Sequence, residues 1–292
     1  MWTHVKLKPK NLKVNKLAKL HALGNVVKQF KYNGHRFTIY KQKDETLKCF
    51  ESSGTIRPEL EMSIKRPKIV EYDWYKKLQR IPPLSSVDGE LYVPGGNAGD
   101  AAHAIAECLP ELEFMPFAVP WWRDKDRGHS DLRYAETLMR GQGLPFATIY
   151  KLYPHETLES LCSDAVSLRI EGFVLKESNY TGWWKVKPQK EIDCIVTGFK
   201  EGAGKYLGGV GSLRVSVWIE QGEDVRKLVE IGSVSGMEDS IRWNIDESAD
   251  LGRVCEVEYQ EIGNGGRFIH GHFVRWRDDK TADECVVDRS EL

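Results

Sequence analysis

The chain has 292 residues, a length that favours two domains over one. Hydrophobic residues make up 41% and charged residues 29%, and no apolar run approaches the about 18 residues that a membrane span needs. This composition excludes a membrane-spanning protein and a wholly disordered chain.

Six cysteines lie far apart without a CxxC pair, which argues against a zinc ribbon and against a dense disulfide framework. We expect ordinary buried thiols. The first residues lack the pattern of a secretory signal, so we expect a cytoplasmic protein.

The charge is unevenly distributed along the chain. Residues 1–43 contain eleven basic and no acidic residues, whereas residues 190–292 contain 13 basic and 21 acidic residues. The amino-terminal excess predicts a polyanionic partner. Because the rest of the chain is acidic, any nucleic-acid surface is expected to be a localised patch.

Hydrophobic periodicity and turn residues predict a mixed α+β region over residues 1–188. A helix near 13–22 should end at Gly24, and strands should follow at 26–30, 36–41 and 46–51, the first two joined by a turn at Asn33-Gly34. Further helices are expected at 72–79, 98–108 and 131–141. Further strands are expected at 89–93, 114–119, 147–152, 172–176 and 183–187.

The pattern changes after Pro188. Five short strands, at 194–199, 213–219, 228–234, 255–262 and 267–276, are separated by glycine-rich turns, with one helical stretch near 238–241. This density of strands is typical of a small Greek-key barrel of the OB kind. We therefore predict two domains, 1–188 and 189–292.

Lys31 belongs to the segment Lys31-Tyr32-Asn33-Gly34-His35-Arg36. A lysine held at a turn can attack an activated phosphorus and form a phosphoramidate if neighbouring cations and desolvation lower its pKa. A solvent-facing hairpin lysine is the alternative interpretation of this segment alone.

Two acidic residues, Glu90 and Glu171, each stand at the predicted start of a strand. Together they could hold Mg²⁺ beside a triphosphate, because this ion prefers one or two carboxylates plus substrate phosphates. Taken singly, each could equally be a solvated acid.

Two pairs of basic residues could bind phosphate. Lys185 and Lys187 alternate along one strand, so both ammonium groups should point to the same side. Arg277 and Lys280 form a second pair that could meet leaving phosphates.

Together these segments resemble the ordered motif set of covalent nucleotidyltransferases, in particular compact, phage-like ATP-dependent DNA ligases. The resemblance spans nearly the whole chain. Five motifs carry it: K-x-D-G-x-R at Lys31, Gly34 and Arg36; D-G-E at Asp88, Gly89 and Glu90; E-G-x-V-x-K at Glu171, Gly172, Val174 and Lys176; K-x-K at Lys185 and Lys187; and R-x-D-K at Arg277, Asp279 and Lys280. The glycine-rich segment from Gly208 to Ser212 also looks like the opening of a ligase OB domain.

The resemblance implies an adenylation domain of antiparallel sheets with flanking helices, followed by an OB-fold barrel. It also implies that Lys31 takes AMP from ATP, that AMP passes to the 5′-phosphate of a nick in duplex DNA, and that the 3′-hydroxyl then displaces AMP. ATP is the implied cofactor, with Mg²⁺ or Mn²⁺. We expect a monomer in the cytoplasm of a bacterial or virus-infected cell.

Roles for individual residues follow from the same resemblance. Lys185 and Lys187 would bind the α-phosphate, Glu171 the metal, and Glu90 the ribose or the metal. The ribose side would contact Arg36. The adenine would stack on Phe117 and meet Gln29 through its amino group. Arg277 and Lys280 would orient pyrophosphate.

Two positions depart from the family pattern. Asn33 stands where an aspartate is usual, and Ser53 stands where an arginine is usual, with Arg57 as a possible substitute. Adenylation should tolerate the first change better than sealing does. Two alternatives stay open. An RNA ligase or mRNA-capping guanylyltransferase shares the same lysine chemistry, and the departures at Asn33 and Ser53 leave open a non-catalytic protein that binds nicks or DNA ends.

Overall fold

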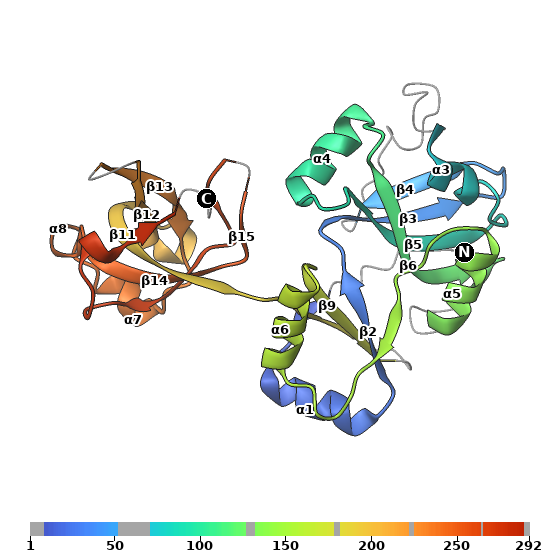
Figure 1. The fold of residues 1–292 in the computed structure, drawn as a ribbon, viewed down its shortest axis with the longest axis horizontal. Helices are drawn as coiled ribbons and strands as arrows, with labels where there is room; N and C mark the ends of the chain where they lie inside the picture. Colours follow the sequence, from blue (N-terminus) through green and yellow to red (C-terminus); the bar gives the residue numbers. More distant parts are fainter. Residues whose placement is uncertain are drawn as a thin grey trace. The chain divides into compact units, whose positions relative to one another are not determined.

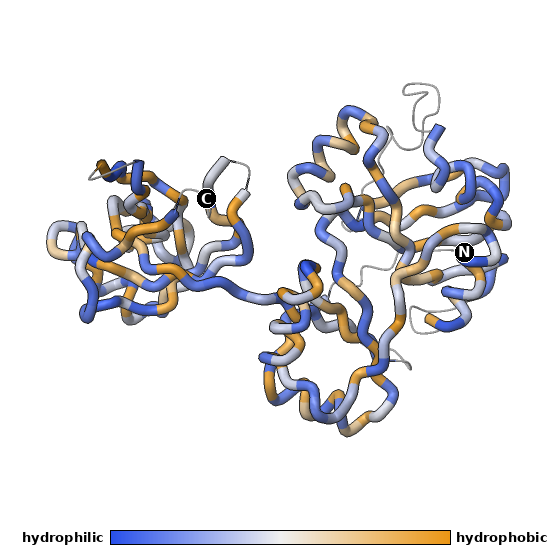
Figure 2. The backbone as a smooth tube through the Cα atoms, viewed as in Figure 1, coloured by the Kyte–Doolittle hydropathy of each residue, from blue (hydrophilic) through white to orange (hydrophobic). Residues whose placement is uncertain are grey.

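A computed structural model describes residues 9–51, 71–126, 132–177, 182–221, 225–263 and 265–288. The chain divides into two compact units, Met1–Pro188 and Gln189–Leu292, called unit 1 and unit 2 below (Figure 1). Hydrophobic and hydrophilic residues alternate along the chain in both units (Figure 2). Each unit has its own hydrophobic core.

Unit 1 contains two five-stranded sheets. The first sheet has the order β1 (Lys10–Asn11), β10 (Trp183–Val186), β9 (Gly172–Glu177), β2 (Val26–Lys31) and β8 (Ile149–Lys151). The second sheet has the order β4 (Leu47–Glu51), β3 (Gly34–Lys41), β5 (Ser85–Tyr92), β6 (Glu113–Trp122) and β7 (Lys125–Asp126). All pairs are antiparallel except β1 with β10.

Two helices cover the first sheet. Helix α1 (Val14–Leu23) buries Leu17 and Leu20 against the strands, and Gly24 ends it in the left-handed conformation, as the sequence predicts. Helix α6 (Leu158–Ser167), which the sequence analysis missed, buries Leu161 in the same cluster. Its signal is the capping box that Thr157 forms with the residue three positions later.

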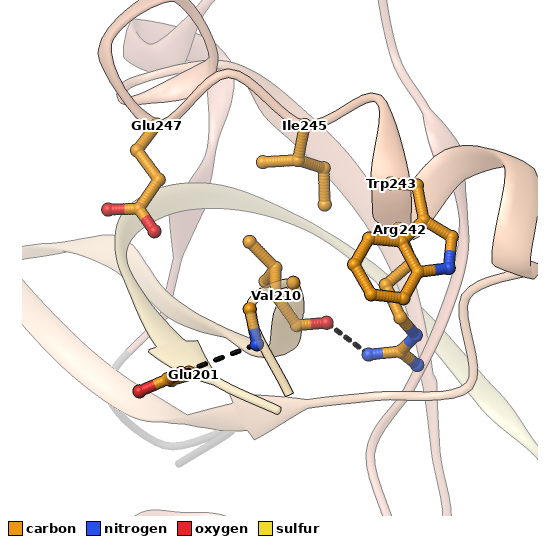
Figure 3. Close-up of a pocket in the computed structure, with 8 residues that line it drawn as sticks. Glu201, Val210, Arg242, Trp243, Ile245 and Glu247 are labelled. Carbon is orange, nitrogen blue, oxygen red and sulfur yellow. Dashed lines mark hydrogen bonds between the residues drawn. The ribbon is translucent and has the colours of Figure 1, made fainter. Parts of the chain in front are cut away.

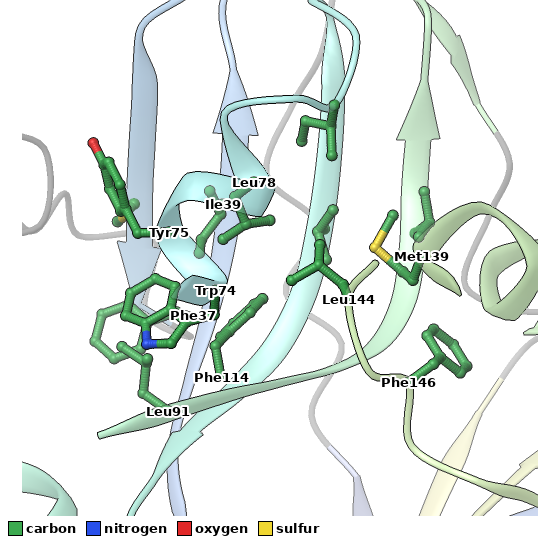
Figure 4. Packing of buried hydrophobic residues seen from close by; sticks show 14 of the residues in the cluster. Phe37, Ile39, Trp74, Tyr75, Leu78, Leu91, Phe114, Met139, Leu144 and Phe146 are labelled. Carbon is green, nitrogen blue, oxygen red and sulfur yellow. The ribbon is translucent and has the colours of Figure 1, made fainter. Parts of the chain in front are cut away.

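Among the described residues, three helices pack with the second sheet: α3 (Asp73–Leu78), α4 (Ala98–Glu107) and α5 (Leu132–Gly141). Figure 4 shows Trp74 and Leu78 of α3 beside Phe37 and Phe114 of the strands. This core continues to Trp183 of the first sheet, so the two sheets share buried side chains.

The connection after Lys31 differs from the predicted hairpin. Strand β2 pairs with β8 and β9, whereas β3 pairs with β4 and β5, so the chain crosses from one sheet to the other between Lys31 and Gly34. A Cβ at Gly34 would lie 2.2 Å from the Leu91 carbonyl oxygen. The glycine is therefore required by the close approach of β5 and not by a tight turn.

Unit 2 is built on a sheet of order β13 (Arg226–Val234), β12 (Val210–Glu220), β11 (Lys190–Glu201), β14 (Val254–Tyr259) and β17 (His272–Trp276). An isolated bridge between Ser235 and His272 joins the two outer strands. The remaining elements are β18 (Val286–Val287), which pairs with β12, the pair β15 (Glu261–Ile262) and β16 (Phe268–Ile269), the helices α7 (Asp239–Trp243) and α8 (Glu247–Asp250), and the 3₁₀ turns Gly204–Tyr206 and Ala282–Glu284.

The glycine-rich loop between β11 and β12 is held by α7. Arg242 is buried and donates from Nη1 to the carbonyl oxygen of Val210 (Figure 3). The same nitrogen donates to the Gly211 carbonyl oxygen, and the guanidinium lies 4.1 Å from the Tyr206 ring centroid. Trp243 packs so closely on the loop that a Cβ at Gly209 would lie 2.7 Å from its ring. A pocket of about 330 Å³ is left between the loop and the helix.

All six cysteines are free thiols, five of them buried and Cys162 partly exposed. In the described part of the chain, no helix has the length and apolarity to cross a membrane.

Candidate active site

The site centres on Glu171, whose two carboxylate oxygens each contact a lysine. Lys31 is the last residue of β2, and its Nζ lies 2.5 Å from Glu171 Oε2. Lys187, directly after β10, forms an ion pair with Glu171 Oε1. The exposed fractions of the three side chains lie between 13% and 20%, so the cluster is largely shielded from water.

Strand pairing explains why these distant residues meet. Lys31 is the register partner of Gly172, the first residue of β9, so Glu171 precedes that position. A Cβ at Gly172 would lie 2.1 Å from the Val186 carbonyl oxygen. The glycine lets β9 and β10 approach closely, which brings Lys187 to the Glu171 carboxylate.

Lys185 adds a third cation. Burial lowers the pKa of Lys185, and the positive charges of Lys187 and Lys31 lower it further, while Glu171 opposes them. The arrangement is thus three lysines around one carboxylate. Such a site binds an anion well, because an added negative charge relieves the repulsion between the lysines.

Glu90 lies in the interior of β5, so the prediction that it stands at the start of a strand is wrong. Burial raises the pKa of Glu90 to about 8, and the charges of Glu171 and Asp88 favour the same shift, whereas Lys31 and Arg36 oppose it. A cation at this carboxylate would favour its ionised form.

The carboxylates fit the donor set that Mg²⁺ accepts with a nucleotide. No group of three or more His, Cys, Asp or Glu side chains that could hold a metal occurs among the described residues. Glu90 and Glu171 are close enough for Glu171 to shift the Glu90 pKa. Two carboxylates with phosphate oxygens completing the shell match the preference of Mg²⁺.

Asp88 holds Arg36 in place, a role that the sequence analysis did not assign. Arg36 donates to Asp88 through Nε at 3.2 Å and Nη2 at 2.5 Å, and Thr38 Oγ1 donates to the same carboxylate at 2.9 Å. The Asp88 side chain is fully buried. The aspartate of the D-G-E motif was the sequence signal for this role, since an acid that is buried needs a cationic partner.

Phe117 belongs to an aromatic cluster with two cations. Its ring meets Trp183 edge to face at 5.7 Å between centroids, and the Arg36 guanidinium lies 5.0 Å from the Trp183 ring. Lys176 lies 3.9 Å from the same ring and donates to the Phe117 carbonyl oxygen at 3.1 Å. Neither Lys176 nor Trp183 is predicted from the sequence to be a site residue, although Lys176 ends the E-G-x-V-x-K motif.

Gln29 is buried, and both ends of its amide are hydrogen bonded. Nε2 donates to the Ala147 carbonyl oxygen at 2.8 Å, and Oε1 accepts from Lys176 Nζ at 2.5 Å. Burial lowers the pKa of Lys176 well below its usual range. Through Lys176, which donates to both, Gln29 is linked to the backbone of Phe117 in β6.

Carboxylates neutralise part of the positive charge in the amino-terminal region. Five of the basic side chains in residues 9–43 have acidic partners: Lys16 with Glu177, Lys28 with Glu156, Lys31 with Glu171, Arg36 with Asp88 and Lys41 with Glu45. Four of these carboxylates come from later segments of the chain, and Glu45 lies four residues after Lys41. The expected polyanionic partner of this region stays a prediction.

Arg277 and Lys280 belong to unit 2, where both contact Asp193 of β11. Asp193 was not singled out in the sequence. Of the two departures from the family pattern, Asn33 lies in the crossover after Lys31, whereas Ser53, with its suggested substitute Arg57, lies outside the described residues.

Comparison with known proteins gives similarities to DNA ligases. The chain is 26% identical over 142 residues to the DNA ligase of Enterobacteria phage T3, covering 45% of this chain and 40% of the relative. It is 32% identical over 145 residues to the DNA ligase of Methanopyrus kandleri, covering 39% of this chain and 25% of the relative. It is 25% identical over 303 aligned positions to the DNA ligase of Methanospirillum hungatei, covering 89% of this chain and 53% of the relative. The chain thus spans from about a quarter to about half of these relatives' lengths. No model of a known protein family matches the sequence.

Solved structures agree on the fold. A structure from a study of Lig E DNA ligases superimposes with a TM-score of 0.62 and 16% identity, covering 93% of this chain and 98% of the other. Another, named Pmar-Lig_Pre, gives a TM-score of 0.69 and 15% identity, covering 93% and 67%. The predicted fold class is confirmed: the chain has the α+β nucleotidyltransferase and OB-fold architecture of DNA ligases and is similar in sequence to proteins of that name.

Proposed function

We propose that this protein is an ATP-dependent DNA ligase that seals nicks between a 5′-phosphate and a 3′-hydroxyl. The proposal is supported by the sequence similarity to DNA ligases, by the shared fold and by the cluster around Glu171. The observation that carries it is the contact between the Lys31 amine and the carboxylate that also binds Lys187.

In the first step, Lys31 Nζ attacks the α-phosphorus of ATP. A P–N bond forms, the bond from the α-phosphorus to the bridging oxygen breaks, and pyrophosphate leaves. The Lys31 ammonium gives up two of its three protons: one leaves before the attack, to free the nitrogen lone pair, and Glu171 Oε2 at 2.5 Å is a nearby acceptor for it. The second leaves to water or pyrophosphate as the P–N bond forms, and the phosphoramidate nitrogen keeps the third. Lys185 and Lys187 neutralise the negative charge of the α-phosphate, and the burial of Lys185 strengthens this interaction because water screens it less.

Glu90 and Glu171 would hold Mg²⁺, which would neutralise charge on the phosphates when it is bound with ATP. Glu171 must then exchange a lysine contact for the ion. Because burial keeps the pKa of Glu90 near 8, the carboxyl is largely protonated at neutral pH until a cation favours its ionised form. Mn²⁺ accepts the same oxygen ligands.

The nucleotide contacts are assigned by resemblance. Phe117 stacks on adenine, Arg36 contacts the ribose side, and Arg277 with Lys280 binds the leaving pyrophosphate. Asp88 and Trp183 hold Arg36 in a fixed orientation, which reduces the entropy lost when the nucleotide binds. For Gln29 we propose a contact to the adenine amino group through Oε1, which has a second acceptor lone pair.

The second and third steps transfer AMP to the 5′-phosphate of the nick and then release it. In the second step a P–O bond joins AMP to that phosphate while the P–N bond to Lys31 breaks. In the third, the 3′-hydroxyl oxygen attacks the 5′-phosphate, AMP leaves, and the phosphodiester forms. Positioning and charge neutralisation dominate such transfers.

The test is transfer of label from ATP carrying ³²P at the α-phosphate. With Mg²⁺ the wild type and Lys227→Ala should form labelled protein, and Lys31→Ala should not. Lys227 is exposed on β13 and serves as the control. The labelled protein should then seal a phosphorylated DNA nick. Labelling by GTP would favour capping, and preference for RNA would favour RNA joining. Absence of any label on the wild type would support a protein that only binds nicks.

A further inference from the structure

One carboxylate in unit 2 holds both cations of the R-x-D-K motif. Asp193 accepts from Arg277 Nη1 at 2.9 Å and 3.1 Å, one contact to each oxygen, and from Lys280 Nζ at 2.5 Å. The Asp193 and Arg277 side chains are each 15% exposed. The three groups therefore form a compact, partly buried cluster.

The donors of Arg277 are occupied by carboxylates. Besides the two contacts from Nη1 to Asp193, Nε and Nη2 donate to the two oxygens of Asp279 at 2.9 Å and 2.8 Å. Glu256 lies 3.6 Å from Nη1. A phosphate can therefore bind this guanidinium only if a carboxylate gives up its contact.

Asp193 is the carboxylate that both cations share. The hydrogen bond to Asp193 also raises the pKa of Lys280, so the ammonium stays charged. Carboxylate and phosphate oxygens recognise Arg and Lys through the same charge-assisted hydrogen bonds, and phosphate brings more negative charge. The two anions are thus alternative ligands for one pair of cations.

We propose that Asp193 is an internal competitor of phosphate for Arg277 and Lys280, and so sets how tightly this pair binds the leaving pyrophosphate. The inference rests on the proposed function, in which the pair binds that group. Asp193 is the positioning residue: it keeps both cations oriented and is displaced when a polyphosphate arrives.

A purely structural bridge would behave differently. Asp193 lies on β11, whereas Arg277 and Lys280 follow β17, so the contacts also tie two segments together. If that were the only role, removing the carboxylate would loosen the cations and weaken phosphate binding. Competition predicts that removing the carboxylate strengthens phosphate binding, because the cations would no longer have to leave Asp193.

The test is calorimetric titration of the full chain with inorganic tripolyphosphate. Asp193→Asn should bind it about tenfold more tightly than the wild type, a ratio that corresponds to about 1.4 kcal/mol and to one charge-assisted hydrogen bond. Asp278→Asn is the matched control, because it makes the same charge change beside Arg277 while Asp278 is exposed and pairs with Arg253. The gain should disappear when Arg277→Ala and Lys280→Ala are added to Asp193→Asn.

Equal or weaker binding by Asp193→Asn than by Asp278→Asn would overturn the proposal. Asp193→Ser, which also removes the charge, gives the same comparison should the asparagine variant not fold. In the labelling reaction with ATP, the Asp193 variant should lower KM more than it changes kcat. If the wild type takes no label from ATP, the proposed ligase function fails, while the tripolyphosphate comparison still decides the role of Asp193.

Discussion

Lys31 and Glu171 are 140 positions apart in the chain, and their side chains meet at 2.5 Å. The contact exists because the end of β2 and the start of β9 are register partners. Lys31 is thereby held beside an acid that has a second cation, Lys187, on its other oxygen.

Replacing Glu171 by glutamine should lower formation of the lysyl-AMP adduct by about 100-fold or more, the size of effect seen when one charge-stabilising group is removed. The reason is that the amide neither orients the two lysines as a carboxylate does nor holds Mg²⁺. The measurement is the initial rate of labelling by ATP. Glu177→Gln is the control, since Glu177 is the last residue of β9 and pairs with Lys16 of α1 at 3.3 Å. Equal rates for the two variants would remove Glu171 from the mechanism.

Glu90 should make the folded state less stable as pH rises. Its pKa is about 8 in the folded protein and near 4.3 when unfolded, so between these values the folded state binds more protons. The free energy of unfolding contributed by this group therefore falls with rising pH across that window and is constant above it. Denaturant titrations at several pH values should show that Glu90→Gln removes this slope, whereas Glu107→Gln on α4 retains it.

Asp88→Asn should destabilise unit 1 by about 3–5 kcal/mol, because it removes the buried carboxylate that neutralises the Arg36 guanidinium. Thr38→Val removes only a neutral donor to the same carboxylate and should cost about 1 kcal/mol. Chemical denaturation measures both. Similar costs for the two variants would mean that the Arg36–Asp88 pair contributes little.

Asn33→Asp should increase nick sealing and leave labelling by ATP within about threefold, a difference of less than 1 kcal/mol. The change introduces the acidic residue of the K-x-D-G-x-R pattern into the crossover after Lys31, where a carboxylate could assist the later steps. The measurement is gel-based sealing of a phosphorylated nick beside the labelling reaction. An equal effect on both reactions would show that Asn33 is not specific to sealing.

Lys13, the N-cap residue of α1, and Lys19 within that helix are exposed and should bind DNA phosphates. If they do, Lys13→Ala with Lys19→Ala should reduce the slope of log affinity against log salt by about 0.9 for each phosphate that the variant no longer neutralises. Nick-binding titrations between low and moderate salt measure the slope, with Lys227→Ala on β13 as the control. A slope unchanged from that of the control would assign DNA binding to other residues.

The sequence alone was sufficient for the fold class and for most elements near the site. Helix α1 and its end at Gly24 follow from local periodicity and from a glycine in the left-handed conformation. The motif order also pointed to Lys31, Glu171 and Lys187 as candidate site residues, because the residue types that bind phosphate and magnesium recur at fixed spacings.

Only the tertiary structure decided which partner each charge has. Lys28 and Lys31 look alike in the sequence, yet one forms a buried pair with Glu156 and the other meets Glu171 in the site. The crossover at Gly34 and the Asp193 contacts likewise depend on strands that pair across long separations. Local patterns record propensity and periodicity, whereas burial and charge pairing arise only when distant segments come together.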